Sequence, residues 1–380
     1  MTLDASAGGP ITLALCGDVM VGRGIDQILP HPGDPTLYEP AISNAASYVA
    51  LARRASGAID APVAPDYIWG DALAMLDEAA PDLRLINLET AITTSDTPWP
   101  GKQIHYRMHP ANIPCLTAAR VGCCVLANNH VLDWGYAGLH ETLRSVQGAG
   151  MLAVGAGLSQ AEAAAPAVMD LAGAGRVLIF AWGLPSSGVP AEWAATEEQP
   201  GVNWLADPSP RAVSQVAAQI AAARRPGDLV VVSLHWGGNW GYYIPRRHRA
   251  FAQQLIAAAG ADIVYGHSSH HPLGIEVYQG RLILYGCGDL INDYEGIGGY
   301  EVYRPDLGLI VLATLDRAGR LVRGRLLPVR RRRLRLWRAA PEEALWLSRR
   351  LSREGRTLGT RVELQPDGSM SLSWRQEPGP

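Results

Sequence analysis

The sequence predicts an α/β fold whose sheet is covered on both faces. Short apolar runs alternate with longer helical segments along most of the chain. These runs are rich in Val, Ile and Leu and lack the polar alternation of a strand with one face in water, which is typical of strands buried on both faces. Hydrophobic residues make up 48% and charged residues 18% of the 380 residues, a composition typical of a globular protein.

The expected strands and helices follow one another in a regular order. We expect strands at residues 11–16, 83–86, 123–126, 176–181, 229–234, 262–265, 281–285 and 308–314. We expect helices at residues 70–80, about 110–120, 135–148, about 209–224 and about 246–259. Asp207 or Ser209 is a suitable N-cap for the fourth helix, because its side-chain oxygen can accept a hydrogen bond from a free N–H group of the first turn.

Two segments break this order. Residues 30–69 contain six prolines and several polar residues, and we expect them to form a loop excursion around a binding cleft. Residues 183–208 are rich in Pro, Trp and Gly and are also expected to be loop-like.

The C-terminal residues 328–380 are expected to form an appendage packed on a main domain of residues 1–327. Their pattern indicates a basic strand, a helix near 341–353 and a hairpin around Pro366-Asp367-Gly368. The basic segment, VRRRRLRLWR at 329–338, is favoured as a short exposed strand over a binding site for polyanions.

Charge and cysteine usage favour a soluble, cytoplasmic protein. The net charge of −3 gives no electrostatic case for nucleic acid as the main partner. The five cysteines form no CxxC pair, which indicates reduced thiols. The N-terminal sequence lacks the basic and long apolar segments of a signal peptide, and no apolar run reaches the length of a membrane-spanning helix, so we expect no membrane partner.

Polar side chains follow six of the expected strands, at the point where each strand ends. The clusters contain Asp18, Asn87 with Glu89, Asn128-Asn129-His130, His235, His267 with His270 and His271, and Asp289. Asn and Asp are ordinary turn residues, so a single cluster has little weight. Histidine has no such preference, and five of the ten histidines fall in these clusters. Because ligands of an open α/β sheet gather beyond the carboxyl ends of its strands, we expect one common site.

The side-chain types indicate a metal site. Mixed Asp, Glu, Asn and His ligands suit Mn, Fe or Zn, and often two ions together, which can bind a phosphoryl group and activate water. A neutral Asn supplies an oxygen without adding negative charge, so such a site stays cationic and attracts a small anionic substrate. A nearby histidine that binds no metal can protonate the leaving group. We therefore assign Asn129 as a metal ligand, His130 as the catalytic acid or an orienting donor, and Asp133 as the partner of His130.

Five motifs resemble those of the CapA family, which is named for poly-γ-glutamate capsule synthesis and is related to the calcineurin-like metallophosphoesterases. They are CGDVMVGRGID (16–26), INLETAIT (86–93), LANNHVLDWGYAGLHETL (126–143), VVVSLHWGGNW (230–240) and GADIVYGHSSHHPLGIEVYQGRLILYGCGDLINDYE (260–295). The match spans residues 11 to about 315. The resemblance implies a four-layer α/β/β/α sandwich of metallophosphoesterase type, with one or two divalent ions of Mn, Fe or Zn at the strand ends.

The resemblance also implies roles for individual residues as metal ligands or as partners of those ligands. Asp18 matches the first-strand ligand, and Glu89 stands where metallophosphoesterases place a bridging aspartate, with Asn87 beside it. Asn129 and His130 match an Asn-His pair. His235 matches the lone histidine that follows its strand.

Two departures from the family pattern affect the ligand set. Val19 and Met20 follow the first aspartate where Asp-x-His is usual, which removes a nitrogen ligand and favours a weaker or single-metal site. The last motif reads Gly-His-Ser-Ser-His-His in place of Gly-x-His-Pro-His. We therefore assign His267 and His270 as ligands, with His271 as the alternative.

We expect a metal-dependent hydrolase, and a phosphoester is the favoured substrate. The alternatives are hydrolysis of an amide such as a γ-glutamyl bond, and a non-catalytic accessory role in poly-γ-glutamate-type polymer synthesis. Lys102, His105, Arg107 and Arg23 are each interpreted either as anion-binding groups or as solvent-facing charges. Asp289 is expected to orient a histidine ligand.

Overall fold

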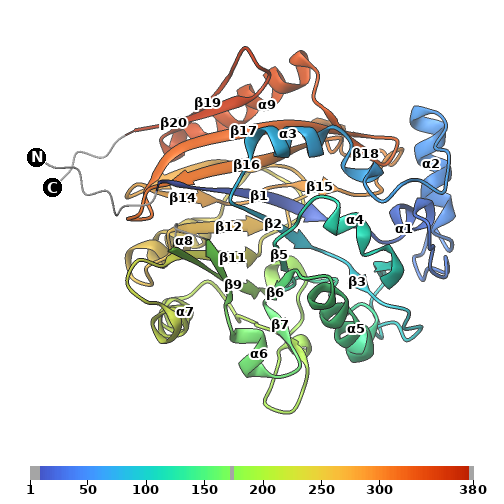
Figure 1. The fold of residues 1–380 in the computed structure, drawn as a ribbon, viewed down its shortest axis with the longest axis horizontal. Coiled ribbons are helices and arrows are strands. Elements are labelled where there is room, and N and C mark those ends of the chain that lie inside the picture. Colours follow the sequence, from blue (N-terminus) through green and yellow to red (C-terminus); the bar gives the residue numbers. More distant parts are fainter. Residues whose placement is uncertain (1–8, 172–174, 376–380) are drawn as a thin grey trace, which may run out of the picture.

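The computed structural model describes residues 9–171 and 175–375, and its largest sheet has ten strands (Figure 1). These strands are β1 (Ile11–Val19), β2 (Leu83–Leu88), β5 (Cys123–Val125), β6 (Leu152–Val154), β15 (Asp289–Ile291), β16 (Leu307–Leu315), β17 (Leu321–Arg332), β18 (Arg335–Arg338), β19 (Thr360–Leu364) and β20 (Met370–Trp374). Their order is β19-β20-β17-β16-β1-β2-β5-β6, with β15 beside β1 and β18 beside β17. The half from β1 to β6 is parallel, and the half from β16 to β19 is antiparallel.

A second sheet has six strands. They are β8 (Ala167–Leu171), β9 (Gly175–Gly183), β11 (Leu229–His235), β12 (Ile263–His267), β13 (Ile275–Tyr278) and β14 (Arg281–Leu284). The order is β13-β14-β12-β11-β9-β8, with four parallel strands in the centre and an antiparallel strand at each edge. Two small sheets pair β3 (Ala91–Ile92) with β4 (Arg107–Met108) and β7 (Ala156–Gly157) with β10 (Gly201–Val202).

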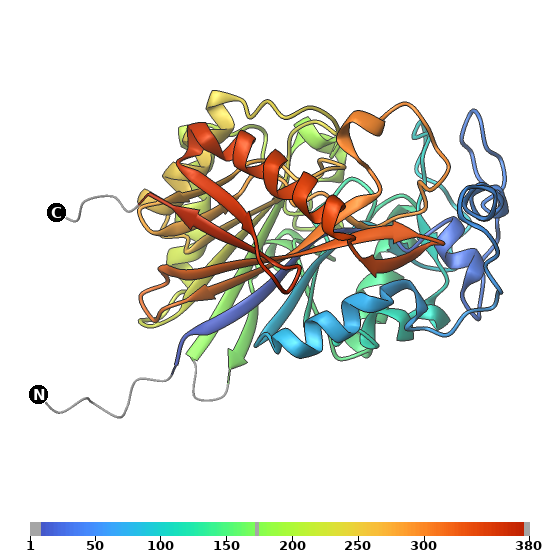
Figure 2. The same ribbon diagram turned by 90° about the horizontal axis from the view of Figure 1, so that it is seen from above.

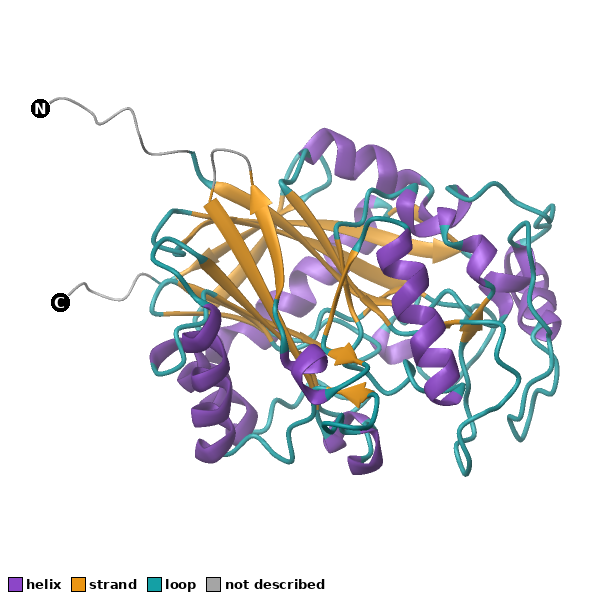
Figure 3. Cartoon of the chain, turned by 60° about the horizontal axis from the view of Figure 1, so that its bottom comes forward, coloured by secondary structure: helices purple, strands orange, loops and turns teal. Residues whose placement is uncertain are grey.

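Helices flank the strands (Figure 3). They are α1 (Gly24–Ile28), α2 (Ala46–Ser56), α3 (Asp71–Ala79), α4 (Pro114–Thr117), α5 (Gly135–Gly148), α6 (Gln160–Ala164), α7 (Pro210–Ala223), α8 (Arg246–Ala257) and α9 (Pro341–Gly355). Short 3-10 turns occur at Tyr67–Trp69, Pro110–Asn112, Pro185–Ser187, Ala191–Trp193, Glu301–Tyr303 and Arg356–Leu358. Among the described residues, no helix combines the length and the apolar character needed to cross a membrane.

Three of the four apolar core clusters follow from strand alternation, and the fourth is a small one of Leu37, Ala45 and Tyr48. Leu13 and Leu15 of β1 point toward the second sheet and share a cluster with Ile179 of β9. Ala14 points to the opposite face of the first sheet, where α3 and α5 pack. The other face of the second sheet packs against α7 and α8, whose apolar residues recur at helical spacing, as in Val216 and Ile220. The mixed α/β class predicted from the sequence is confirmed.

Each expected strand is present, but the helix expected at about 110–120 is divided and shorter than expected. Two short elements, the 3-10 turn at Pro110–Asn112 and α4, take its place. Each begins at a proline, which has no N–H group and is therefore tolerated only in a first turn. Ser209 is the N-cap of α7, where its Oγ accepts from Ala212 N at 3.4 Å. The 30–69 excursion contains α2, which the sequence did not predict.

The C-terminal elements are the expected ones, and they extend the first sheet. Figure 2 shows α9, in red, alongside the red and orange strands. The basic segment forms the end of β17, a turn at Arg333-Leu334 with positive φ, and β18. Arg331 within it is 6% exposed, so the expectation of an exposed strand is wrong for this residue. β17 runs through residues 327 and 328, and the domain division at that point stays a prediction.

Candidate metal centre

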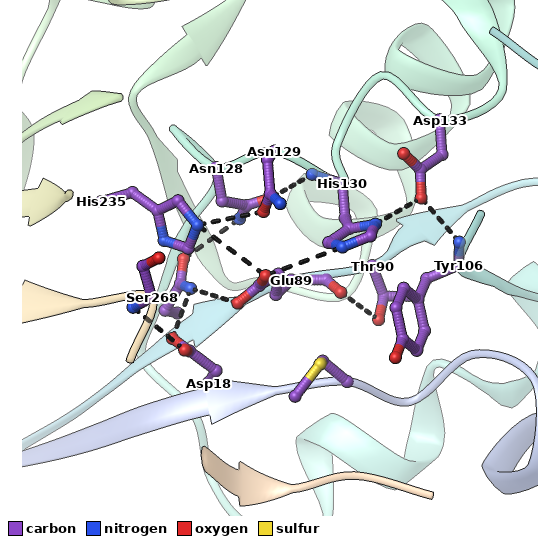
Figure 4. Close-up of polar contacts among 12 residues, drawn as sticks. Asp18, Glu89, Thr90, Tyr106, Asn128, Asn129, His130, Asp133, His235 and Ser268 are labelled. Atoms are coloured by element: carbon purple, nitrogen blue, oxygen red, sulfur yellow. Dashed lines mark hydrogen bonds and ion pairs between the residues drawn. The ribbon is translucent and has the colours of Figure 1, made fainter. Parts of the chain in front are cut away.

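The carboxyl ends of strands from both sheets meet at one place (Figure 4). Asp18 on β1 is in register with Asn87 on β2. His235 on β11 is in register with His267 on β12. The two sheets are joined here by a hydrogen bond, in which the backbone N–H of Ser268 donates to Asp18 Oδ2 at 3.1 Å. Four of the predicted residues are therefore neighbours, although they come from distant parts of the sequence.

Asp18, His235 and His267 form a buried group of possible metal ligands. One donor atom from each residue lies within 4.8 Å of the other two. The Nδ1 atoms of the two histidines are 2.7 Å apart, and His267 Nδ1 lies 4.0 Å from Asp18 Oδ1. Ser233 Oγ lies 2.7 Å from His267 Nε2 and fixes that ring. One carboxylate with two imidazoles is a donor set that suits borderline divalent ions.

Glu89 and Asn129, also predicted as ligands, lie next to this group. Glu89 Oε1 is 3.7 Å from His235 Nε2 and 3.8 Å from His130 Nε2, so the carboxylate faces two imidazoles. Asn129 Oδ1 is 3.0 Å from His235 Nε2. Both oxygens therefore face the same ring nitrogen of His235.

Asn87 uses both ends of its amide within the site. Its Nδ2 donates to Asp18 Oδ1 at 2.7 Å and to Glu89 Oε2 at 3.3 Å. Its Oδ1 accepts from Asn128 Nδ2 at 3.1 Å, and Asn128 Nδ2 also donates to the carbonyl of Leu88 at 2.9 Å. The amide group thus holds two acidic side chains in place, while its assignment as a metal ligand stays a prediction.

His130 and Asp133 are in direct contact, as the sequence predicted. His130 Nδ1 lies 2.7 Å from Asp133 Oδ2, which also accepts from the backbone N–H of Tyr106 at 2.6 Å. The ammonium of Lys102 donates to Asp133 Oδ1 and to the carbonyl of Asn129, and its Nζ lies 3.2 Å from His130 Nδ1. Because Nδ1 is occupied, the Nε2 atom of His130 faces Glu89 and the metal group.

The site concentrates acidic groups where there is little water. Burial, and then Asp289, raise the pKa of Asp18 to about 7. Burial raises the pKa of Glu89 well above its usual value, and the neighbouring Asp18 and Asp289 add to this. Desolvation favours the neutral acid, and like charges close together do the same. A bound cation would reverse both effects, so the acidic residues present fit a divalent ion.

The imidazoles of the site favour the neutral form that can bind a metal. Burial lowers the pKa of His267 to about 3 and that of His130 to about 4. Burial, and then His267, lower the pKa of His235 well below its usual value. A neutral ring presents a lone pair to an ion, whereas an imidazolium does not.

His270 lies at the edge of the site rather than in the metal group. Its Nδ1 is 3.0 Å from Asp289 Oδ1, the contact expected of an orienting aspartate. Burial opposes protonation, but Asp289 raises the pKa of His270 above its usual value. His271 accepts from Gly241 N at 3.1 Å through Nε2 and stacks on Tyr303 with ring centroids 4.8 Å apart. Of the three histidines, only His267 belongs to the group of possible ligands.

The other cationic residues of the region have structural partners. Arg23 binds Asp293 and Glu39, and its guanidinium lies 3.9 Å from the ring centre of Tyr48. Arg107 donates to the carbonyls of Ser95 and Asp34 at 2.7 and 2.9 Å. Neither arginine is free to bind an anion in this arrangement.

The sequence did not lead us to expect the position of Lys102 inside the site. It is the only lysine among the 33 basic residues, because all the others are arginines. Its side chain is 19% exposed, so it is not a solvent-facing charge. The composition contains an indication of this role, because the chain uses arginine at every other basic position and lysine only at 102. A position that needs a compact ammonium, which can donate in three directions, would explain this difference.

Comparisons with known proteins agree with the motifs. The family model described as "Bacterial capsule synthesis protein PGA_cap" matches residues 12–294. The "Probable polyglutamine synthesis accessory protein" of Mycobacterium tuberculosis is 48% identical over 370 residues, which cover 96% of this chain and 97% of that protein. The "PGA biosynthesis protein CapA" of Bacillus subtilis is 27% identical over 285 residues, covering 74% of this chain and 63% of that protein.

The "Capsule biosynthesis protein CapA" of Bacillus anthracis is 26% identical over 287 residues, covering 74% of this chain and 60% of that protein. A crystal structure aligns with 85% of this chain at 11% identity and a TM-score of 0.38, which is too low to support an argument about the fold. The family model covers most of the chain and the mycobacterial relative nearly all of it. The chain therefore belongs to the CapA family of bacterial capsule synthesis proteins.

Proposed function

We propose that this chain is a metal-dependent hydrolase and that its substrate is a small phosphoester. The supporting observation is the meeting of Asp18, His235 and His267 from three strands, each with a donor atom within 4.8 Å of the other two. We include in the proposal the four-layer α/β/β/α sandwich of metallophosphoesterase type, and an appendage of residues 328–380 on the main domain.

The proposed division of labour follows from the contacts. One or two divalent ions of Mn, Fe or Zn, when bound, would polarise the phosphoryl group and lower the pKa of water. Asp18, His235 and His267 would hold the metal, with Glu89 and Asn129 as further ligands. These side chains are kept in place by strand register and by the amide of Asn87, so little reorganisation is needed on binding.

His130 is the proposed proton donor to the leaving group. Its Nδ1 is bonded to Asp133, which fixes the tautomer and leaves Nε2 to exchange the proton. An anionic substrate near Nε2 would favour protonation of this ring, because an opposite charge stabilises the imidazolium. Lys102 stabilises the negative charge of Asp133 and thereby holds the ring indirectly.

Metal content and chelation test the proposal. Purified protein should contain Mn, Fe or Zn by elemental analysis, and hydrolysis of p-nitrophenyl phosphate should be lost with EDTA and restored by Mn²⁺. Asp18→Asn and His235→Gln should lower metal content, whereas His130→Ala should retain metal and lower the turnover number. His140→Gln is the control, because His140 is exposed on α5. Protein that binds no metal and is indifferent to EDTA would contradict the proposal.

The names of the relatives favour a second candidate, an accessory role in polymer synthesis. The mycobacterial protein is named as an accessory protein of polyglutamine synthesis, and the Bacillus proteins are named for PGA or capsule biosynthesis. In that role the site would bind without turnover, or would cleave an amide such as a γ-glutamyl bond. A panel of phosphoesters and γ-glutamyl amides separates the two chemistries. Co-purification with a synthase, with function unchanged in His130→Ala, would support the non-catalytic role.

A further inference from the structure

A cavity of about 510 Å³ opens beside the candidate metal centre, and its described lining includes none of Asp18, His235 and His267. Its walls come from α2, the segment after β15, the 3-10 turn at Glu301–Tyr303 and the end of β17. Sites for small molecules have volumes of about 300–1,000 Å³, so this cavity has a suitable size.

The lining of the cavity contacts a neighbour of the metal group. His270 and Asn292 line the cavity, and both bond to Asp289. His270 Nδ1 lies 3.0 Å from Asp289 Oδ1, and Asn292 Nδ2 donates to Asp289 Oδ2 at 2.8 Å. Asp289 is paired with Asp18 in the register of β1 and β15. One residue therefore connects the cavity wall to a proposed metal ligand.

The lining also comes close to the proposed proton donor. Tyr294 lines the cavity, and its hydroxyl accepts from that of Tyr106 at 3.0 Å. The ring of Tyr106 packs edge-on against His130, with ring centroids 4.6 Å apart. Ile104 lines the cavity as well, two residues after Lys102, whose Nζ lies 3.2 Å from His130 Nδ1. Tyr106 thus connects the lining to the group that would protonate a leaving alcohol.

Large apolar side chains are exposed inside the cavity. Ile104 is 43% exposed and Ile297 and Tyr300 are each 40% exposed, and all three belong to the lining. Tyr300 stacks on Trp240, with ring centroids 4.0 Å apart, and the ring of Trp240 lies 5.2 Å from that of His270. The three rings form an aromatic wall that begins at the edge of the metal centre. Since covering apolar surface is favourable, exposed apolar groups in a concave site are typical of a binding pocket.

Four of the five arginines that the described chain contributes to the lining already have partners. The ion pairs are Arg23 with Asp293, Arg304 with Asp306, and Arg330 with Glu343. Arg331 donates to backbone carbonyls, including that of Leu307 at 2.8 Å. The cavity therefore offers a ligand mainly apolar contacts.

We propose that this cavity holds the alcohol part of the substrate, and that the substrate is a phosphomonoester of a bulky apolar alcohol such as one with an aromatic ring. The phosphoryl group lies at the metal centre, and the ring lies against Tyr300 and Ile297. In the hydrolysis the oxygen of water bonds to phosphorus and loses a proton, the bond from phosphorus to the alcohol oxygen breaks, and that oxygen takes a proton from His130. This inference rests on the proposed hydrolysis and adds to it the class of the leaving group.

Two esters that differ by a phenyl ring test the preference. Ethyl phosphate and 2-phenylethyl phosphate both release a primary alcohol, so their leaving groups are chemically alike. With Mn²⁺ bound, kcat/KM should be about tenfold or more higher for 2-phenylethyl phosphate, mainly through KM, because even one methylene in an apolar pocket can contribute about tenfold. Equal values of kcat/KM overturn this inference and leave the hydrolase proposal intact. No hydrolysis of these esters or of p-nitrophenyl phosphate overturns the hydrolase proposal, and this inference with it.

Binding of a free aromatic alcohol gives a readout that needs neither metal nor turnover. 2-Naphthol is equilibrated with the protein by dialysis in the presence of EDTA. It should bind with a Kd below about 1 mM, which is the affinity expected of a ligand of this size in an apolar pocket. Absence of binding in this range overturns the inference whatever the activity of the protein.

Variants then assign the pocket. Tyr300→Ala removes a ring from the wall, and should raise both the KM for 2-phenylethyl phosphate and the Kd of 2-naphthol about fivefold or more while leaving the KM for ethyl phosphate unchanged. Ile297→Ala should act in the same direction, and Tyr300→Phe should retain wild-type values because it keeps the ring. The matched control is Val302→Ala, because Val302 follows Tyr300 in the 3-10 turn, is 65% exposed and is not among the described residues of the lining. Unchanged KM and Kd in folded Tyr300→Ala and Ile297→Ala proteins overturn the inference.

Discussion

Replacing Lys102 by Met should disrupt the site while leaving the chain folded. The substitution keeps the length of the side chain and removes two charge-assisted hydrogen bonds, to Asp133 Oδ1 and to the carbonyl of Asn129. Such bonds contribute about 1.5–3 kcal/mol each. Because the lysine no longer has to be desolvated and its side chain is 19% exposed, the net loss is smaller. We expect the free energy of unfolding to fall by about 2–4 kcal/mol.

Lys102→Met should also weaken metal binding or activity. Removing an outer partner of a metal-site residue typically costs about 10–100-fold in metal affinity or activity. Urea denaturation measures the effect on folding, and metal affinity with kcat and KM for the best substrate measures the functional effect. Lys102→Arg should be intermediate, because a guanidinium keeps the charge but is larger than the ammonium and directs all its donors in one plane. Wild-type stability and wild-type activity in Lys102→Met would refute the positioning role.

Three further predictions concern the scaffold, and urea denaturation measures each of them. Tyr265→Phe removes the hydroxyl that donates from the second sheet to the carbonyl of Cys16 in the first sheet, and should lower the free energy of unfolding by about 1 kcal/mol. No loss would mean that this hydrogen bond does not contribute to stability. Gly17→Ala places a Cβ atom 1.6 Å from the carbonyl oxygen of Gly288, and should cost at least about 2 kcal/mol; a smaller cost would show that the strands separate easily. Burial raises the pKa of Glu141, but hydrogen bonds from two threonines lower it below its ordinary value of 4.5. The ionised Glu141 therefore stabilises the fold above about pH 4.5, and this stabilisation is lost as the pH falls through the lower pKa of the folded state. Glu141→Gln should accordingly reduce the loss of folding stability at acid pH. An unchanged dependence of stability on acid pH would contradict this.

Sequence reasoning recovered the strands that are buried on both faces. Such strands must be apolar throughout, so runs such as 229–234 and 262–265 identify them without any tertiary information. It did not recover β15, which lies beside β1 and contains the polar residue Asp289. A three-residue strand carries too little pattern for any periodicity. It exists because β1 offers a free edge at its carboxyl end, and only the folded sheet shows that edge.

The site was predictable where one polar residue follows one buried strand. His235 and His267, expected at one common site, lie side by side because the parallel register of β11 and β12 pairs them, while their role as metal ligands stays a prediction. The partners of the surrounding charged residues were not predictable in this way. Arg23 and Lys102 look alike in the sequence, yet one is bound by Asp293 and Glu39 and the other lies against His130. The partners of Arg23 are 16 and 270 residues away, which no local pattern reveals.

The two asparagines of the Asn128-Asn129 pair have different physical tasks, and neither is a generic turn residue. Asn128 is fully buried and connects strand ends: its Nδ2 donates to Asn87 Oδ1, and its Oδ1 accepts from the backbone N–H of His130 at 3.1 Å. Only a side chain with both a donor and an acceptor can make these contacts, so aspartate would lose the first and add another negative charge beside Glu89. Asn129 instead presents an oxygen toward His235 at 3.0 Å. Carboxamides here maintain the geometry of an acidic site without increasing its negative charge, which keeps the cost of burying its carboxylates lower than further acidic residues would.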